Sequence, residues 1–213
     1  MSQKIAVLDY GMGNLRSVSK AIEHVAPDAE VRVTDDHDWI RRADRVVFPG
    51  QGAARDCMAA IGRHHLNQAI REAVEAKPFL GICMGLQVLM AFSEENEGTE
   101  LLGILPGKVV RFSESMPGER GLPLKIPHMG WSRVAQAQPH PLWEGIEDGS
   151  RFYFVHSYHV VPEDEGLIAG VTEYGVSFAS ALARDNLFAV QFHPEKSADA
   201  GLRLLENFVR WMP

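Results

Sequence analysis

The first half of this chain alternates short apolar segments with amphipathic ones, and this alternation restricts the fold more than any other feature. Buried strands are predicted at residues 4–10, 30–34, 45–48 and 78–82. The apolar spacing predicts helices at 15–25, at 53–76 with an interruption near Gly62, and at 86–92, with Asn14 as the N-cap of the first. Strands that alternate with helices in this way predict an α/β fold, with a mainly parallel central sheet covered by helices on both faces.

The second half predicts additional strands that pair in an antiparallel manner. Residues 101–115 and 122–138 are broken by Pro and Gly and are partly strand-like. Successive strands are predicted at 151–161, 167–174, 176–183 and 187–192, with Asp185-Asn186 as a hairpin turn. A closing helix is expected at 198–211. No change of composition marks a linker and no repeat is present, so we expect one domain over residues 1–213.

Composition limits the classes of function. The 213 residues carry a net charge of −7 without a basic cluster, which argues against binding to nucleic acid. No apolar stretch approaches the roughly 18 residues that a membrane span needs. Cys57 and Cys83 form no CxxC pair, and the nine histidines show no metal-ligand spacing, so we expect a cytoplasmic protein with neither metal nor cofactor.

The segment around Cys83 carries the strongest chemical signal. An apolar strand runs into Gly81-Ile82-Cys83-Met84-Gly85, and an apolar segment follows. A sharp turn from strand to helix exposes the side chain at its apex, and small residues two positions before and after it prevent collisions with the neighbouring backbone. A helix N-terminus also favours the reactive thiolate. Cys83 is therefore a candidate nucleophile; the alternative is a small buried residue, which is how we interpret Cys57.

A cysteine nucleophile needs a base, and the base needs an orienting group. Gln191-Phe192-His193-Pro194-Glu195 follows the last predicted strand, where an α/β sheet places its ligands. His193 and Glu195 lie two positions apart, so an extended backbone across Pro194 puts both side chains on one face. We expect Glu195 to hold the imidazole of His193. The alternative is an ordinary His and Glu at a solvated strand end.

Acyl transfer also needs hydrogen-bond donors directed at the substrate oxygen that becomes negative in the tetrahedral intermediate. The N–H of Met84 is one candidate. The glycine-rich loop Gly50-Gln51-Gly52, at the end of another predicted strand, is a second candidate or a plain turn.

In combination these motifs resemble the class I, triad-type glutamine amidotransferases, and the resemblance covers nearly the whole chain. It implies a flavodoxin-like fold and a triad of Cys83, His193 and Glu195. The thiolate attacks the side-chain amide of glutamine, ammonia leaves, and water hydrolyses the γ-glutamyl thioester. Many relatives have Pro-Gly-Val-Gly in the oxyanion loop, whereas this chain has Gln51.

The resemblance also implies roles for other positions. The residues that hold the α-amino and carboxylate groups of glutamine are Gln87, Glu95, Ser157 and Tyr158. Segments 9–15, 126–131 and 153–158 are similar to one branch, in which the glutaminase forms a heterodimer with a (β/α)8-barrel cyclase subunit. The residues that face this partner and the ammonia passage are Asn14, Met129, Trp131, Tyr153 and Lys196.

Two alternatives remain open at this stage. The chain is the amidotransferase subunit of another synthase, such as one that makes anthranilate, or it is a non-catalytic flavodoxin-like binding protein. In the second case residues 9–14 cradle a phosphate at a helix N-terminus, although the full Gly-x-Gly-x-x-Gly spacing is missing.

Overall fold

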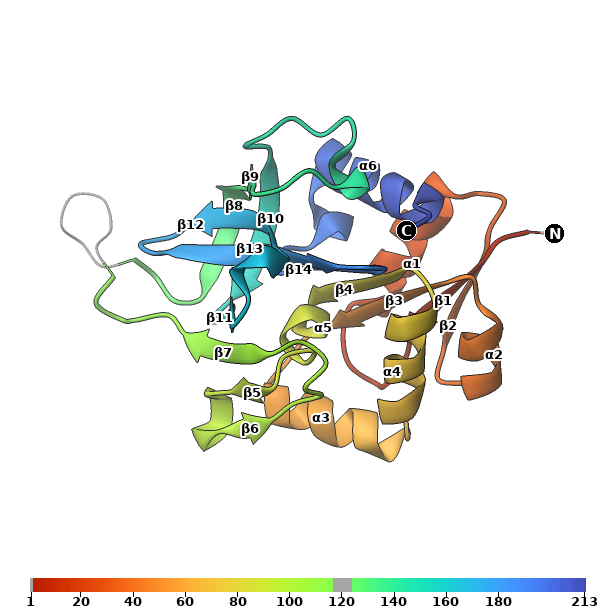
Figure 1. The fold of residues 1–213 in the computed structure, drawn as a ribbon, viewed down its shortest axis with the longest axis horizontal. Coiled ribbons are helices and arrows are strands. Elements are labelled where there is room, and N and C mark those ends of the chain that lie inside the picture. Colours follow the sequence, from red (N-terminus) through yellow and green to blue (C-terminus); the bar gives the residue numbers. More distant parts are fainter. Residues whose placement is uncertain (1, 117–123) are drawn as a thin grey trace.

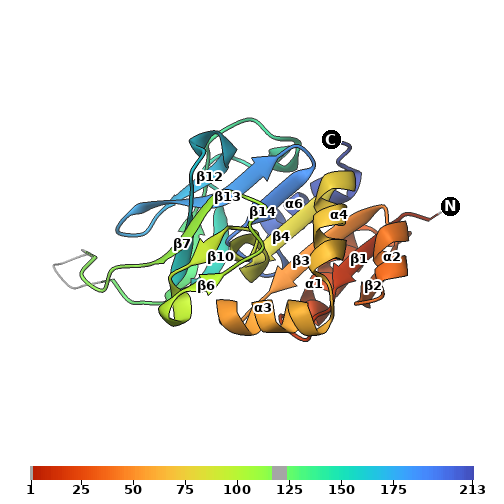
Figure 2. The same ribbon diagram turned by 60° about the horizontal axis from the view of Figure 1, so that its bottom comes forward.

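The computed structural model describes residues 2–116 and 124–213, and a parallel sheet lies at its centre. Its strands are β1 (Lys4–Leu8), β2 (Glu30–Thr34), β3 (Arg45–Gly50), β4 (Phe79–Cys83) and β14 (Leu187–Val190). They lie in the order β2-β1-β3-β4-β14, and every neighbouring pair is parallel. This order is typical of flavodoxin-like sheets. Figure 2 shows β4 between β3 and β14.

Helices cover both faces of this sheet, as the alternation predicts. Alternate residues of β1 belong to different cores: Ala6 and Leu8 pack on one side, Ile5 and Val7 on the other. The first side is covered by α2 (His37–Arg42), α3 (Ala54–Arg63), α4 (Asn67–Ala76) and α5 (Met84–Gln87). The second is covered by α1 (Leu15–Val25) and α6 (Ala198–Arg210), and in Figure 1 α6 lies across the sheet from α4.

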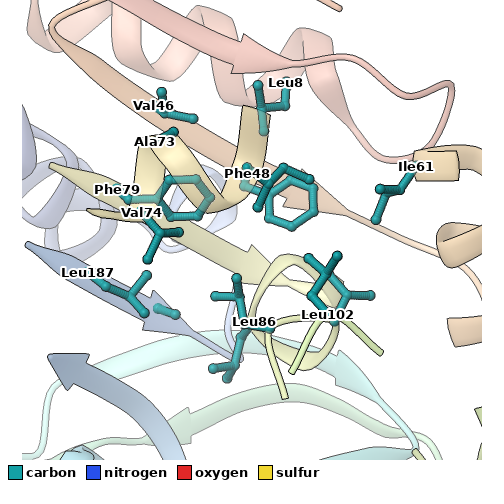
Figure 3. Close-up of a cluster of buried hydrophobic side chains, with 14 of the residues drawn as sticks. Leu8, Val46, Phe48, Ile61, Ala73, Val74, Phe79, Leu86, Leu102 and Leu187 are labelled. Carbon is teal, nitrogen blue, oxygen red and sulfur yellow. The ribbon is translucent and has the colours of Figure 1, made fainter. Parts of the chain in front are cut away.

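The first of these cores holds β3, β4 and the helices together (Figure 3). The rings of Phe48 and Phe79 lie 5.9 Å apart, edge to face, and Leu86 and Leu187 are fully buried in the same cluster. Full burial of each such side chain stabilises the fold by roughly 1.5–3 kcal/mol. The strands that end at the candidate site are thus fixed by close packing beneath it.

Beyond β14 the sheet continues with strands that are mostly antiparallel, as the second half of the sequence predicts. The exception is the parallel pair formed by residues 92–93 and 107–111. The further strands are β5 (Phe92–Ser93), β6 (Thr99–Glu100), β7 (Gly107–Arg111), β9 (Ala135–Gln136), β11 (Tyr158–Pro162), β12 (Ile168–Glu173) and β13 (Ser177–Arg184). β8 (His128–Arg133) and β10 (Arg151–His156) form a separate antiparallel pair. Short 3-10 turns occur at η1 (Glu95–Glu97), η3 (Pro141–Trp143), η4 (Glu165–Leu167) and η5 (Pro194–Lys196). The hairpin at Asp185-Asn186 is confirmed.

The structure corrects three local predictions. The helix at 86–92 is wrong: only the turn Met84–Gln87 is helical, because the carbonyls of Val88, Leu89 and Met90 accept hydrogen bonds from residues 102–105. The strand at 151–161 is two strands of different sheets. Asn14 precedes α1 as predicted, but its side chain makes no capping hydrogen bond.

No helix among the described residues is long and apolar enough to cross a membrane.

Candidate active site

Cys83 lies at the apex of a strained turn between β4 and α5. Its backbone has φ +55° and ψ −108°, a conformation that costs a non-glycine residue about 1–3 kcal/mol. The turn is tight. A Cβ atom added to Gly85 would lie 1.8 Å from the carbonyl oxygen of Phe48, and a Cβ atom added to Gly81 would lie 2.9 Å from the carbonyl oxygen of Gly85. The small residues that the motif provides are therefore required by sterics, and the strain is located at the candidate nucleophile.

His193 and Glu195 reach the same edge of the sheet because β14 lies beside β4. The Nδ1 atom of His193 and Oε1 of Glu195 are 2.9 Å apart, and both side chains are at least 98% buried. The backbone differs from the expectation: Pro194 begins the 3-10 turn η5, so the residues from Pro194 to Lys196 are not extended. The side chains meet nonetheless, because the turn brings the carboxylate back beneath the ring.

The surroundings of His193 favour its protonated form. Burial lowers the pKa of this imidazole, but the Cys83 and Glu195 side chains outweigh burial and raise the pKa to about 10. Nδ1 donates to the carboxylate, and Nε2 has no hydrogen-bond partner in residues 2–116 and 124–213. His193 and Cys83 both line one pocket.

This pocket has a volume of about 440 Å³, which suits a small ligand. It contains all four residues expected to hold glutamine and three of the four in the expected oxyanion site. Its lining consists of Gln51, Gly52, Cys83, Met84, Gln87, Glu95, Pro127, Val155, His156, Ser157, Tyr158, His193 and Lys196. Gly50 is adjacent, as the register partner of Cys83 across β3 and β4.

Two side chains hold carbonyls of the segment that we call the loop 49–52, which consists of the last two residues of β3, Pro49 and Gly50, and the two residues that follow. The Tyr10 hydroxyl donates to the Pro49 carbonyl at 3.0 Å, and the Cys57 thiol donates to the Gln51 carbonyl at 3.5 Å. Burial raises the pKa of Cys57 to about 12, which keeps it a thiol and agrees with the structural role predicted for it. Gly52 has φ +101°, which favours glycine. Because peptide units are planar and trans, the N–H groups of Gly50 and Gly52 point away from the side on which Tyr10 and Cys57 hold these carbonyls.

Two of the expected glutamine-binding side chains are partly engaged by the protein. Gln87 Nε2 donates to the Tyr158 carbonyl and to Gln191 Oε1, both at 3.0 Å, so only its oxygen is available to a ligand. Glu95 Oε2 accepts from the Ala54 N–H at 2.6 Å, at the start of α3. Both residues can thus offer oxygen acceptors to an ammonium group.

The expected partner-facing residues gather beside the pocket. On β8, Met129 and Trp131 are 62% and 48% exposed. The rings of Trp131 and Tyr153 lie 6.1 Å apart, and Lys196 Nζ lies 5.9 Å from the centre of the Tyr153 ring. Asn14 is elsewhere in the sequence, but Gly13 next to it packs against Gly50 of the loop.

Sequence reasoning assigned no role to Tyr10, His156 or Gln191, which the structure places at this site. Tyr10 bonds to the loop 49–52, His156 lines the pocket, and Gln191 Nε2 donates to Cys83 Sγ at 3.8 Å. Gln191 and Cys83 are 108 positions apart, so no local pattern connects them. The sequence signal for all three is that they lie within segments that the sequence analysis singled out, 9–15, 153–158 and 191–195.

Cys83 on its strand-to-helix turn and the buried His193–Glu195 pair thus meet at one pocket, an arrangement that suits hydrolysis or acyl transfer by a thiol nucleophile. The model of the glutamine amidotransferase class-I family matches residues 6–211. A putative GMP synthase subunit from Thermoplasma acidophilum has a similar fold, with a TM-score of 0.72 and 18% sequence identity over 99% of this chain and 94% of that chain. PurLQS from Thermotoga maritima also has a similar fold, with a TM-score of 0.72 and 18% identity over 99% of both chains. The chain is a class I glutamine amidotransferase.

Comparison with curated proteins shows to which family within this class the chain belongs. The imidazole glycerol phosphate synthase subunit HisH of Thiobacillus denitrificans is 64% identical over all of this chain and 93% of its own length. That of Methylococcus capsulatus is 57% identical over 98% of this chain and 97% of its own length. Within the class, the chain belongs to the HisH family.

Proposed function

We propose that this chain is the glutaminase subunit of imidazole glycerol phosphate synthase in histidine biosynthesis. It hydrolyses glutamine to glutamate and ammonia through Cys83, His193 and Glu195. The observation that best supports this function is that the Cys83 turn and the hydrogen-bonded His193–Glu195 pair meet at one pocket. Because both thiols are free, as a reducing compartment favours, we propose the cytoplasm as its location.

In the first half of the reaction, the Cys83 thiolate attacks the side-chain carbonyl carbon of glutamine. The oxygen that becomes negative is stabilised by the N–H of Met84 and by N–H groups of the loop Gly50-Gln51-Gly52. His193 starts as imidazolium and gives the Nε2 proton to the departing nitrogen. Ammonia leaves, and a γ-glutamyl thioester remains on the sulfur.

In the second half, His193 acts as a base. Acylation removes the negative charge of the sulfur, which is one of the influences that raise the pKa of His193. The imidazole, now neutral, accepts a proton from water as the water oxygen attacks the thioester carbonyl. Glutamate leaves, the thiolate re-forms, and Glu195 stabilises the imidazolium through Nδ1.

Ammonia must reach its acceptor without becoming ammonium. We propose that a (β/α)8-barrel cyclase docks over Met129, Trp131, Tyr153, Lys196 and Asn14, receives the ammonia, and makes imidazole glycerol phosphate and AICAR from PRFAR. Exposed Met and Trp beside the pocket suit such a docking surface. The loop 50–52 is the proposed two-state element through which the cyclase activates the glutaminase.

The decisive experiment measures glutaminase turnover with and without the cyclase and its nucleotide substrate. Cys83→Ser is expected to abolish glutamine-dependent synthesis in the complex and to leave synthesis from ammonium salts intact. Loss of both activities would show that Cys83 has a different role, and equal turnover with and without the partner would remove the proposed switch.

The two alternatives make different predictions. Co-purification with a synthase that makes anthranilate would indicate a different partner, whereas identities of 57–64% to HisH subunits favour the cyclase. A non-catalytic binding protein would not be alkylated at Cys83 by a reactive glutamine analogue.

A further inference from the structure

A chain of buried and part-buried hydrogen bonds connects the exposed strand β8 to the sulfur of Cys83. Its members are Ser132, His128, His156, the carbonyl of Tyr158, Gln87 and Gln191, and we call it the amide–histidine chain. The successive distances, from Ser132 Oγ to Cys83 Sγ, are 2.8, 3.0, 2.7, 3.0, 3.0 and 3.8 Å. The proposed triad chemistry uses none of these bonds.

The direction of each histidine bond follows from its acceptor. A carbonyl oxygen only accepts, so His156 carries its proton at Nδ1 and donates to Tyr158. Burial lowers the pKa of His156 to about 3 and that of His128 to about 4, so both rings are neutral. His156 Nε2 therefore accepts from His128 Nδ1, and His128 Nε2 accepts from the Ser132 hydroxyl. One tautomer of each ring satisfies all the bonds.

The two amides are fixed in the same way. Gln87 uses both N–H groups, one on the Tyr158 carbonyl and one on Gln191 Oε1. Gln191 is fully buried, and with its oxygen accepting from Gln87 its nitrogen must point to Cys83. A flipped Gln191 amide would set N–H against N–H and oxygen against sulfur. The donor that faces the nucleophile is thus oriented by Gln87 and the Tyr158 carbonyl, and the His156 N–H holds that same carbonyl in place.

We propose that Gln191 is a positioning residue for the Cys83 thiolate, held in its donor orientation by the amide–histidine chain that ends at Ser132 on β8. A charged sulfur is stabilised by this donor more than a neutral one is. Because β8 also exposes Met129 and Trp131, a shift of that strand is transmitted to the nucleophile through the chain. This coupling concerns the proposed docking surface and depends on the proposed function, whereas the positioning of Cys83 is measurable without it.

The test measures the rate of Cys83 alkylation by iodoacetamide against pH, with the labelled site identified by mass spectrometry. Gln191→Met keeps the length of the side chain and removes the donor, so alkylation at pH 7 should slow roughly 10-fold and the midpoint of the profile should rise. The matched control is Gln136→Met, because the Gln136 side-chain amide also donates a hydrogen bond, in its case to the Ile146 carbonyl, and Gln136 does not line the pocket.

A second variant tests the remote end of the chain. The His128 ring is stacked between Phe154 and Tyr174, so His128→Phe keeps the aromatic packing and removes both nitrogens; alkylation should slow roughly 3- to 10-fold. His140→Phe is its control, because His140 also packs against aromatic rings, those of Phe188 and Trp211. If His128→Phe fails to fold, Ser132→Ala should slow alkylation about 2-fold and Ser132→Thr should restore it.

Unchanged alkylation in folded Gln191→Met overturns the proposal, and so does equal slowing in the two controls. Failure of the proposed function can be told apart from failure of this positioning role. If the wild-type complex with the cyclase does not hydrolyse glutamine but Gln191→Met still slows alkylation, the positioning role stands and the proposed reaction is wrong.

Discussion

Gly85 lies directly against Phe48, so that a Cβ on Gly85 would come within 1.8 Å of the Phe48 carbonyl oxygen. The first turn after the nucleophile is thereby pressed onto β3, the strand that leads into the loop 49–52. The position of Cys83 relative to this loop depends on the absence of a single side chain.

Gly85→Ala should therefore disturb both the fold and the activity. We expect a loss of about 1–3 kcal/mol of unfolding free energy, together with loss of glutaminase turnover, because the alanine methyl forces β3 and α5 apart. Thermal unfolding and a glutaminase assay measure the two effects. Gly62→Ala, in α3 with no atom near its would-be Cβ, should be as stable as wild type or up to about 1 kcal/mol more stable. Equal effects at both positions would contradict the steric explanation.

Glu195→Gln should lower the pKa of His193 from about 10, because the attraction of the carboxylate is lost while burial still opposes the charge. Less imidazolium is then present at pH 8, and kcat should fall roughly 10²- to 10⁴-fold. The imidazole titration by NMR and the pH–rate profile provide the measurements. Glu206→Gln is the control, since Glu206 pairs with Arg203 and Arg210 on the surface of α6 and should leave both unchanged.

Tyr10→Phe removes the hydroxyl that donates to the Pro49 carbonyl. We expect kcat to fall roughly 3- to 10-fold with KM nearly constant, since the loop is needed when the oxyanion forms. Tyr174→Phe removes an exposed hydroxyl bonded to the Lys125 carbonyl and should have no such effect. A rise in KM alone would place Tyr10 in substrate binding instead.

Acid should destabilise the protein through its buried histidines. Burial lowers the pKa of His140 to about 4, whereas an unfolded chain titrates near the ordinary value of about 6.5. Between these values the unfolded state binds a proton that the folded state does not, so the free energy of unfolding falls as the pH drops from 6.5 to 4. His128 and His156 act in the same direction.

Urea unfolding at pH 7 and pH 5 measures this fall. In His140→Asn the amide oxygen replaces Nδ1 as acceptor for the Leu142 N–H, and the loss at pH 5 should be smaller than in wild type by up to about 2 kcal/mol. The same loss in both proteins would contradict this origin.

Trp131→Ala should weaken binding of the proposed cyclase partner roughly 30-fold, or about 2 kcal/mol, since exposed Trp residues are frequent hot spots. Titration calorimetry measures the affinity. Val176→Ala changes another exposed apolar residue, on the turn between β12 and β13, and should bind normally. Normal binding of both variants would place the docking surface elsewhere.

The sequence predicted the parallel sheet because each of its strands is encoded locally, as a short apolar run bounded by turns. The helix at 86–92 was wrong because its carbonyls bond to residues 102–105, an interaction that no local pattern contains. The helix α2 was missed, although Asp36 caps it by accepting from the Asp38 and Trp39 N–H groups, because only six residues are helical.

In the candidate site, too, the residues in local motifs were predicted and those that depend on distant contacts were not. Cys83, His193 and Glu195 follow from motifs beside strand ends, and their catalytic roles remain predictions. The partners of Gln191 and Tyr10 are 108 and 39 positions away, so these residues acquire a role only when the strands assemble. Expecting an extended backbone through Glu195 failed because the pairing forms across a turn.

The placement of β14 beside β4 has a consequence for biosynthesis of the chain itself. The ribosome makes β4, which ends at Cys83, well before β14, which leads to His193, so a nascent polypeptide that still lacks β14 cannot bring these two residues together. The proposed glutaminase activity therefore requires β14, and we expect it to arise only after Met129, Trp131 and Tyr153 of the proposed docking surface have been made.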